Sequence, residues 1–104
     1  LHGIAHITGG GLCENLQRIL PDGVEAQMTR SSWTVPAVFT WLQGLGNITQ
    51  AEMDRVFNMG IGMVLAVPAD VAEAVRFASS TDEYQSVILG KVVASDGAGK
   101  AVLA

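Results

Sequence analysis

A run of three glycines near the start of the chain, Gly9-Gly10-Gly11, constrains its fold more than any other feature. Residues 4–7 before it are mostly apolar and typical of the end of a strand. Leucine and isoleucine after it recur at the spacing of one α-helix face, at Leu12, Leu16, Ile19 and Leu20. A glycine loop between a strand and a helix can bind an anion, because no Cβ blocks the ligand and the first-turn N–H groups have no intrahelical partner.

The glycines alone leave two interpretations open. They match neither the G-x-G-x-x-G pattern nor the P-loop pattern, so a tight turn explains them as well as a ligand site does. Polar residues crowd around them, namely His6, Thr8, Glu14 and Asn15, and a turn that serves only packing needs none of these. A second pair, Gly60 and Gly62, is another place where backbone can contact a ligand, or where a helix can pack closely on a strand.

The length of 104 residues predicts one domain at most. Hydrophobic residues make up 49% of the chain and charged residues only 15%, which is few charges for a small soluble domain. We therefore expect apolar surface that another domain or a second copy of the chain covers. The chain starts at Leu1 in the middle of a pattern, so we expect it to be part of a longer polypeptide.

Several function classes are excluded by charge and residue content. The net charge is −4 and the six basic residues are spread singly, which excludes a nucleic-acid binder. The single cysteine, Cys13, excludes an internal disulfide and a cysteine-based zinc site; its place in a first helical turn can lower the thiol pKa, although a packing role is more common. No apolar run reaches the ~18–20 residues of a membrane span, so we expect a cytoplasmic protein.

Strands and helices alternate along the chain, which predicts an α/β or α+β layered domain with a mixed sheet covered by helices. Further strands are expected at 24–28, 63–67, 87–94 and 100–104, and further helices at 36–44, about 50–58 and 71–80. The apolar run 63–67 is typical of a strand covered on both faces. Gly90 indicates a bulge in its strand, and the 95–99 loop predicts an antiparallel hairpin.

Large apolar side chains of these elements are expected to form the core. The aromatic members are Trp33, Phe39 and Trp41, since large aromatic side chains are usually buried. Helical periodicity adds Met53, Val56 and Phe57 from one helix and Val71, Val75 and Ala78 from the next.

Short motifs that run in order along nearly the whole chain indicate a family. They are His6-Ile7-Thr8-Gly9-Gly10-Gly11-Leu12, Arg18-Ile19-Leu20-Pro21, Ser32-Trp33, Trp41-Leu42-Gln43 and Phe57-Asn58-Met59-Gly60-Ile61-Gly62-Met63. This series resembles the aminoimidazole ribonucleotide synthetases, also called phosphoribosylformylglycinamidine cyclo-ligases. The resemblance implies that residues 1–104 are a single partial domain, the C-terminal part of the synthetase C-terminal domain. The complete enzyme would be a longer, homodimeric enzyme of purine biosynthesis, which uses ATP to convert formylglycinamidine ribonucleotide to aminoimidazole ribonucleotide, ADP and phosphate.

The same resemblance implies roles for individual residues. Backbone N–H groups of Gly9, Gly10 and Gly11 would bind a phosphate or phosphoryl group, and Thr8 and Asn15 would add side-chain hydrogen bonds. His6 would orient the reacting end of the phosphorylated ribonucleotide or exchange a proton with it, since histidine ordinarily titrates near neutrality. Gly60 and Gly62 would form a neighbouring wall. ATP and Mg²⁺ would be bound mainly by an N-terminal domain absent from this chain, so no metal ligand and no independent activity are expected here.

Two alternatives remain at this stage. The chain can be a non-catalytic self-association module whose glycine loop is only a turn. It can also be a fragment of a related ATP-using enzyme of the selenophosphate synthetase or thiamine-phosphate kinase type.

Overall fold

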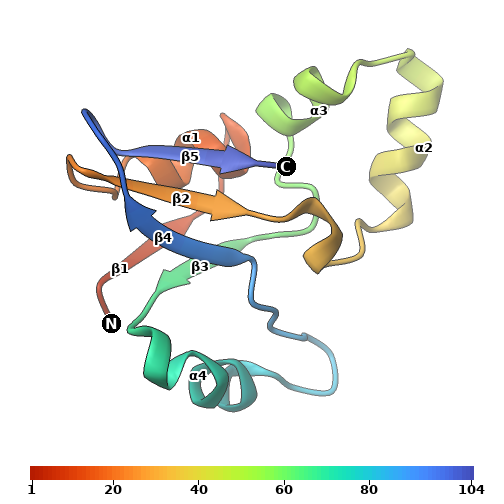
Figure 1. Cartoon of the computed structure of the whole chain (residues 1–104). Helices are drawn as coiled ribbons and strands as arrows, with labels where there is room; N and C mark the ends of the chain where they lie inside the picture. The colour runs from red at the N-terminus through yellow and green to blue at the C-terminus, as the bar shows by residue number, and fades with distance from the viewer.

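The computed structural model describes all residues, Leu1–Ala104, and has an α+β fold with two small sheets (Figure 1). Its strands are β1 (Gly3–His6), β2 (Val24–Met28), β3 (Met63–Ala66), β4 (Gly90–Ala94) and β5 (Lys100–Leu103). Its helices are α1 (Gly11–Gln17), α2 (Ala37–Gly46), α3 (Gln50–Val56) and α4 (Ala72–Ser79), with 3₁₀ turns η1 (Arg30–Ser32) and η2 (Ala69–Val71). The prediction of a mixed sheet with helices is confirmed.

The two sheets differ in how their strands pair. β1 and β3 form an antiparallel pair in which His6 lies opposite Met63. The other sheet has the order β4-β2-β5, with β4 antiparallel and β5 parallel to the central β2. No helix is both long and apolar enough to cross a bilayer.

The predicted hairpin between the last two strands is wrong. The 95–99 loop carries the chain past the end of β2, so that β4 and β5 lie on opposite sides of it. Two backbone hydrogen bonds hold this crossing: Ser95 N–H to Gly23 O, 2.9 Å, and Gly23 N–H to Gly97 O, 2.8 Å. Turn-forming residues signal that the chain reverses, but they do not specify which strand it joins afterwards.

Gly90 does not form the predicted bulge. It pairs with Met28 in regular register at the start of β4, and residues 87–89 precede the strand. A Cβ at this position would collide with the carbonyl oxygen of Gln27. The glycine therefore serves the close approach of two strands.

One apolar core joins β1, α1 and β2. It consists of Ala5, Ile7, Leu12, Leu16, Ala26 and Met28. Burying each large side chain of this kind stabilises the fold by about 1.5–3 kcal/mol relative to leaving it exposed. Since Ile7 and Leu12 flank the glycines on both sides, this core fixes where the glycine loop lies.

Several predicted core positions are wrong. β3 is packed on one face only, so Met63 and Leu65 face solvent on the other. Trp41 on α2 and Val56 on α3 are also exposed. Neither Val71 nor the inward face predicted for α4 is buried. The apolar periodicity of these elements is real, but no other element of this chain packs along the faces concerned.

Candidate functional site

The site centres on residues 8–11, here called the glycine loop, which connect β1 to α1. Gly10 and Gly11 have φ values of 99° and 77°, a left-handed conformation that side-chain-bearing residues rarely adopt. The N–H of Gly11 donates to the carbonyl oxygen of Thr8 at 3.1 Å, which closes the turn. The N–H groups of Gly9 and Gly10 have no hydrogen-bond partner within the chain, and nothing lies within 4 Å of a Cβ built on Gly9. An anion can therefore approach this backbone closely.

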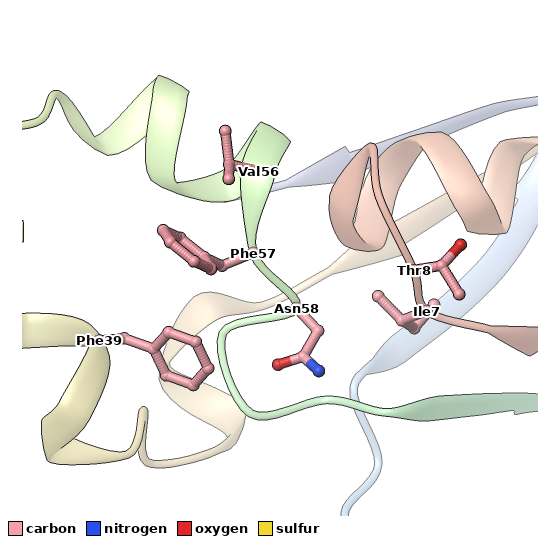
Figure 2. Close-up of a pocket in the computed structure, with 6 residues that line it drawn as sticks. All are labelled: Ile7, Thr8, Phe39, Val56, Phe57 and Asn58. Atoms are coloured by element: carbon pink, nitrogen blue, oxygen red, sulfur yellow. The ribbon is translucent and has the colours of Figure 1, made fainter. Parts of the chain in front are cut away.

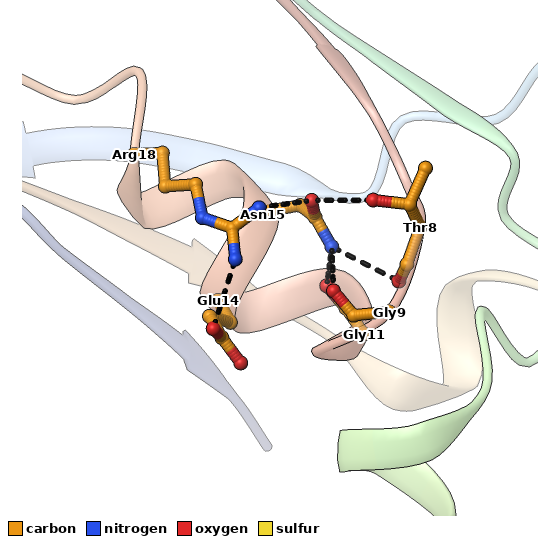
Figure 3. Close-up of polar contacts among 6 residues, drawn as sticks. All are labelled: Thr8, Gly9, Gly11, Glu14, Asn15 and Arg18. Atoms are coloured by element: carbon orange, nitrogen blue, oxygen red, sulfur yellow. Dashed lines mark hydrogen bonds and ion pairs between the residues drawn. The ribbon is translucent and has the colours of Figure 1, made fainter.

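Asn15, a buried residue of α1, holds the glycine loop in shape (Figure 3). Its side-chain nitrogen donates to the carbonyl oxygens of Thr8 at 3.1 Å, Gly9 at 3.3 Å and Gly11 at 2.7 Å. Its side-chain oxygen accepts from the Thr8 hydroxyl at 3.1 Å and from Arg18 at 3.0 Å. The nitrogen and the oxygen of the Asn15 side-chain amide thus both have hydrogen-bond partners within the chain. A direct contact between Asn15 and a ligand stays a prediction.

The three glycines of the loop differ in how a side chain at each position would fit into the structure. A Cβ on Gly11 would overlap the carbonyl oxygen of Asp54, so this glycine lets α1 approach the backbone of α3. A Cβ on Gly10 would meet only the carboxylate of Glu14, a flexible side chain. Gly9 faces open space. The part of the glycine loop open to a ligand is therefore its first half.

The second glycine pair lies beside the glycine loop. The N–H of Ile7 donates to the carbonyl oxygen of Gly62 at 2.9 Å, which brings the two glycine segments together. Gly62 has open space around its Cα, whereas Gly60, with φ 101°, lies where a Cβ would collide with the ring of Pro36. Gly62 is thus the accessible member of the pair, and Gly60 is needed for packing.

A hollow of about 210 Å³ opens next to Thr8 (Figure 2). It is lined by Ile7, Thr8, Phe39, Val56, Phe57 and Asn58. In Figure 2 the two phenyl rings lie on one side of the hollow and Ile7 and Thr8 on the other. The rings are 5.7 Å apart between centroids and tilted by 57°. The hollow therefore offers an apolar wall together with the polar groups of Thr8 and Asn58.

His6 lies at the end of β1, two residues before Thr8. Its side chain is exposed and makes no hydrogen bond within the chain. The structure thus brings His6, Thr8, Gly9, Gly10 and Gly62 to one region, which local sequence indicated only for the first four.

Comparison with known proteins shows to which family the chain belongs. The family model for the C-terminal domain of AIR synthase related proteins matches residues 1–102 of this chain. The chain belongs to this family. The phosphoribosylformylglycinamidine cyclo-ligase of Symbiobacterium thermophilum is 48% identical over 103 residues, which is 99% of this chain and 29% of that relative. The chain therefore spans less than a third of the length of this relative. The family resemblance seen in the motifs is confirmed.

In this AIR synthase family chain, an ion pair between Arg30 and Asp54 lies next to the glycine loop. The guanidinium of Arg30 donates to both carboxylate oxygens of Asp54, at 3.0 and 2.6 Å, and Gln50 donates to one of them at 3.0 Å. The hydrogen bond from Arg30 holds the pKa of the Asp54 carboxyl below its usual value. Because the backbone of Asp54 also touches Gly11, the pair fixes α3 against the glycine loop.

Cys13 has no sign of reactivity. Burial, together with the nearby carboxylate of Asp54, raises the pKa of its thiol. The possible lowering by the helix terminus is therefore wrong, and Cys13 packs against the core as a small apolar group.

The Asp54 carboxylate should make stability sensitive to acid. Since its folded-state pKa is below the ordinary 3.8, its contribution is complete above that value and is lost as the pH falls through the folded-state pKa. We expect Asp54→Asn to lower the free energy of unfolding at pH 7 and to flatten its decline below about pH 4. Urea unfolding from pH 7 to pH 2 measures both. Asp82→Asn, which removes an exposed carboxylate without an ion pair, is the control. A decline in Asp54→Asn as steep as in the unmodified chain contradicts this account.

Proposed function

We propose that this chain is the substrate-holding C-terminal part of an ATP-dependent cyclo-ligase that converts formylglycinamidine ribonucleotide to aminoimidazole ribonucleotide, with release of ADP and phosphate. The observation that carries the proposal is the glycine loop: its first half has two unpartnered N–H groups, and Asn15 holds it in place. Similarity to the Symbiobacterium cyclo-ligase supports this function over a self-association module, for which a fixed loop has no use.

The proposed reaction needs positioning more than a protein nucleophile. The terminal phosphoryl group of ATP is transferred to the formyl oxygen with release of ADP. A nitrogen of the same molecule then attacks the formyl carbon and loses a proton. The C–O bond breaks, and the oxygen leaves as inorganic phosphate. Negative charge on phosphoryl oxygens would be stabilised by the N–H groups of Gly9 and Gly10. Thr8 and His6 would orient the reacting end, with Gly62 as the neighbouring wall.

Magnesium and most ATP contacts are proposed for the part of the enzyme outside these residues. No group of three or more His, Cys, Asp and Glu side chains in this chain is arranged to hold a metal ion. No step on this chain is assigned to Mg²⁺. By analogy with the family, the complete enzyme is proposed to be a cytoplasmic homodimer.

A chimeric enzyme tests the proposal. The matching stretch of the Symbiobacterium cyclo-ligase would be replaced with this chain, and formation of aminoimidazole ribonucleotide would be measured. We expect the chimera to be active. His6→Ala and Thr8→Val should each lower kcat/KM by about 10-fold or more, equivalent to ~1.4 kcal/mol of transition-state stabilisation. His6→Ala should leave the Tm almost unchanged, whereas Thr8→Val should also lower the Tm, because the Thr8 hydroxyl donates a hydrogen bond to Asn15.

Matched substitutions at exposed positions are the controls. His2→Ala and Thr40→Val change the same residue types outside the proposed site, and both should retain unmodified kinetics. Unmodified kinetics in His6→Ala and Thr8→Val as well would contradict the assignment of the site.

A further inference from the structure

The helix α2 presents an apolar stripe that nothing in this chain covers. Val38, Trp41 and Leu45 are 51%, 62% and 68% exposed, and their spacing of three and four residues places them on one helix face. Figure 1 shows α2 at the side of the molecule, away from both sheets. No residue between Arg30 and Glu52 carries a charge, so the surface of this helix also lacks the charged side chains typical of a solvated helix.

The stripe is held in place rather than exposed by fraying. The opposite side of α2 carries Phe39, whose ring packs on Phe57 with 5.7 Å between centroids. At the C-terminal end, the Gln43 side chain donates to the carbonyl oxygen of Ile48 at 3.1 Å, and the Ile48 N–H donates back to Gln43 O at 3.1 Å. Phe39 thus packs α2 against Phe57, and the hydrogen bonds between Gln43 and Ile48 close the C-terminal end of the helix.

Such a surface is typical of a binding interface. Exposed apolar side chains scattered singly are ordinary, but a contiguous stripe containing a tryptophan is a common centre of protein–protein contacts. The absence of charges fits the core of an interface rather than its rim.

The size of the stripe indicates its occupant. A ten-residue helix is about 15 Å long, so one face of it buries far less than the ~800 Å² per partner of a stable dimer. Docking between two parts of one polypeptide needs much less buried area, because the effective concentration of the linked partner reaches the millimolar range. The Symbiobacterium relative has 71% of its length outside the matching stretch, since 100% minus 29% is 71%.

We propose that the stripe of Val38, Trp41 and Leu45 docks on an uncharged apolar face of the remaining polypeptide of the complete cyclo-ligase. The inference rests on the proposed function in one respect, namely that the chain works as part of a longer enzyme. The helix α2 would then lie between that polypeptide and the hollow beside Thr8, because Phe39 on its other side lines the hollow.

Photo-crosslinking in the chimeric cyclo-ligase tests the docking without requiring activity. The photoreactive residue p-benzoylphenylalanine would replace Trp41, and the crosslinked peptides would be mapped by mass spectrometry. We expect crosslinks within one polypeptide, to a segment outside these 104 residues, with a yield independent of protein concentration. The matched control places the same residue at Thr40, an exposed position turned by about 100° around α2 from Trp41, and should give several-fold less of this crosslink.

Two results would overturn the proposal. Crosslinks between two copies, with a yield that rises with concentration, would assign the stripe to a dimer contact. A crosslinking yield at position 41 no higher than at position 40 would show that the stripe is exposed to solvent in the complete enzyme.

A second measurement covers the case of a chimera disturbed by the photoreactive residue. Trp41→Glu should lower the Tm of the chimera by several degrees and leave the Tm of the 104-residue chain unchanged, whereas equal shifts in both would contradict docking. Cyclo-ligase turnover is measured separately. A crosslinked but inactive chimera would count against the proposed function and not against the docking.

Discussion

Replacing Gly11 with alanine should remove a large part of the stability of the fold. The residue has φ 77°, and an added Cβ would overlap the carbonyl oxygen of Asp54 in α3. The left-handed conformation and the backbone collision together should cost about 3–5 kcal/mol, a large part of the ~5–15 kcal/mol that stabilises a domain of this size. Far-UV circular dichroism during urea unfolding measures the loss as a lower midpoint.

Gly9→Ala is the matched control in the same loop. Gly9 has no neighbour within 4 Å of a built Cβ and does not have a positive φ, so its substitution should change the free energy of unfolding by less than about 0.5 kcal/mol. Equal stability of the Gly11→Ala and Gly9→Ala variants would contradict the close packing of α1 on α3.

Met53→Ala should produce the second large loss of stability. Met53 is the largest side chain completely removed from solvent, and it lies in the middle of α3. Deleting a buried side chain of this size removes its transfer free energy and leaves a cavity, which together cost about 2–5 kcal/mol. Since α3 supports the glycine loop through Asp54, the hydrogen exchange of the α1 amides should accelerate as well. Urea unfolding and amide exchange measure the two effects.

The neighbouring residue Val56 provides the comparison. It lies on the same helix but is 44% exposed, so Val56→Ala should cost about 1 kcal/mol or less. A loss in Met53→Ala no greater than in Val56→Ala would show that α3 does not contribute a buried anchor.

Local patterns in the sequence predicted the elements near the site because they depend on short-range physics. The β1–loop–α1 unit follows from apolar spacing around the glycines. The start of α3 follows from the sequence Thr49-Gln50-Ala51-Glu52, a capping box, which is typical of a helix N-terminus. Thr49 Oγ1 accepts from the Glu52 N–H at 3.3 Å, as that pattern requires. α1 ends at Gln17 rather than near Leu20, because residues 18–20 form turns of the i→i−3 type.

Pairing between distant strands could not be predicted in the same way. β5 pairs with β2 because the 95–99 loop forms hydrogen bonds with Gly23, which lies more than 70 residues earlier in the chain. The burial of Trp41, Met63 and Leu65 was wrong for a related reason. Periodicity shows which face of an element is apolar, but it does not show whether the same chain supplies the surface that covers it.

The sequence also did not show that the residues of the glycine loop have different roles. Three consecutive glycines cannot be distinguished in the sequence, whereas in the structure Gly11 packs against α3 and Gly9 does not. Asn15 was expected to meet a ligand, whereas its amide bonds three loop carbonyls. The signal that pointed to a loop-holding role was its spacing of four residues after Gly11, which places its side chain back over the first helical turn.

The central claim is that the glycine loop and Gly62 form one phosphate-binding surface. The most direct measurement is an amide NMR titration of the ¹⁵N-labelled chain with ribose 5-phosphate and, separately, with ATP. We expect saturable shifts confined to residues 9–15 and 60–62, with the amides of α4 unchanged. Shifts that do not saturate, or that appear on α4 as strongly as on Gly9 and Gly10, would contradict the claim.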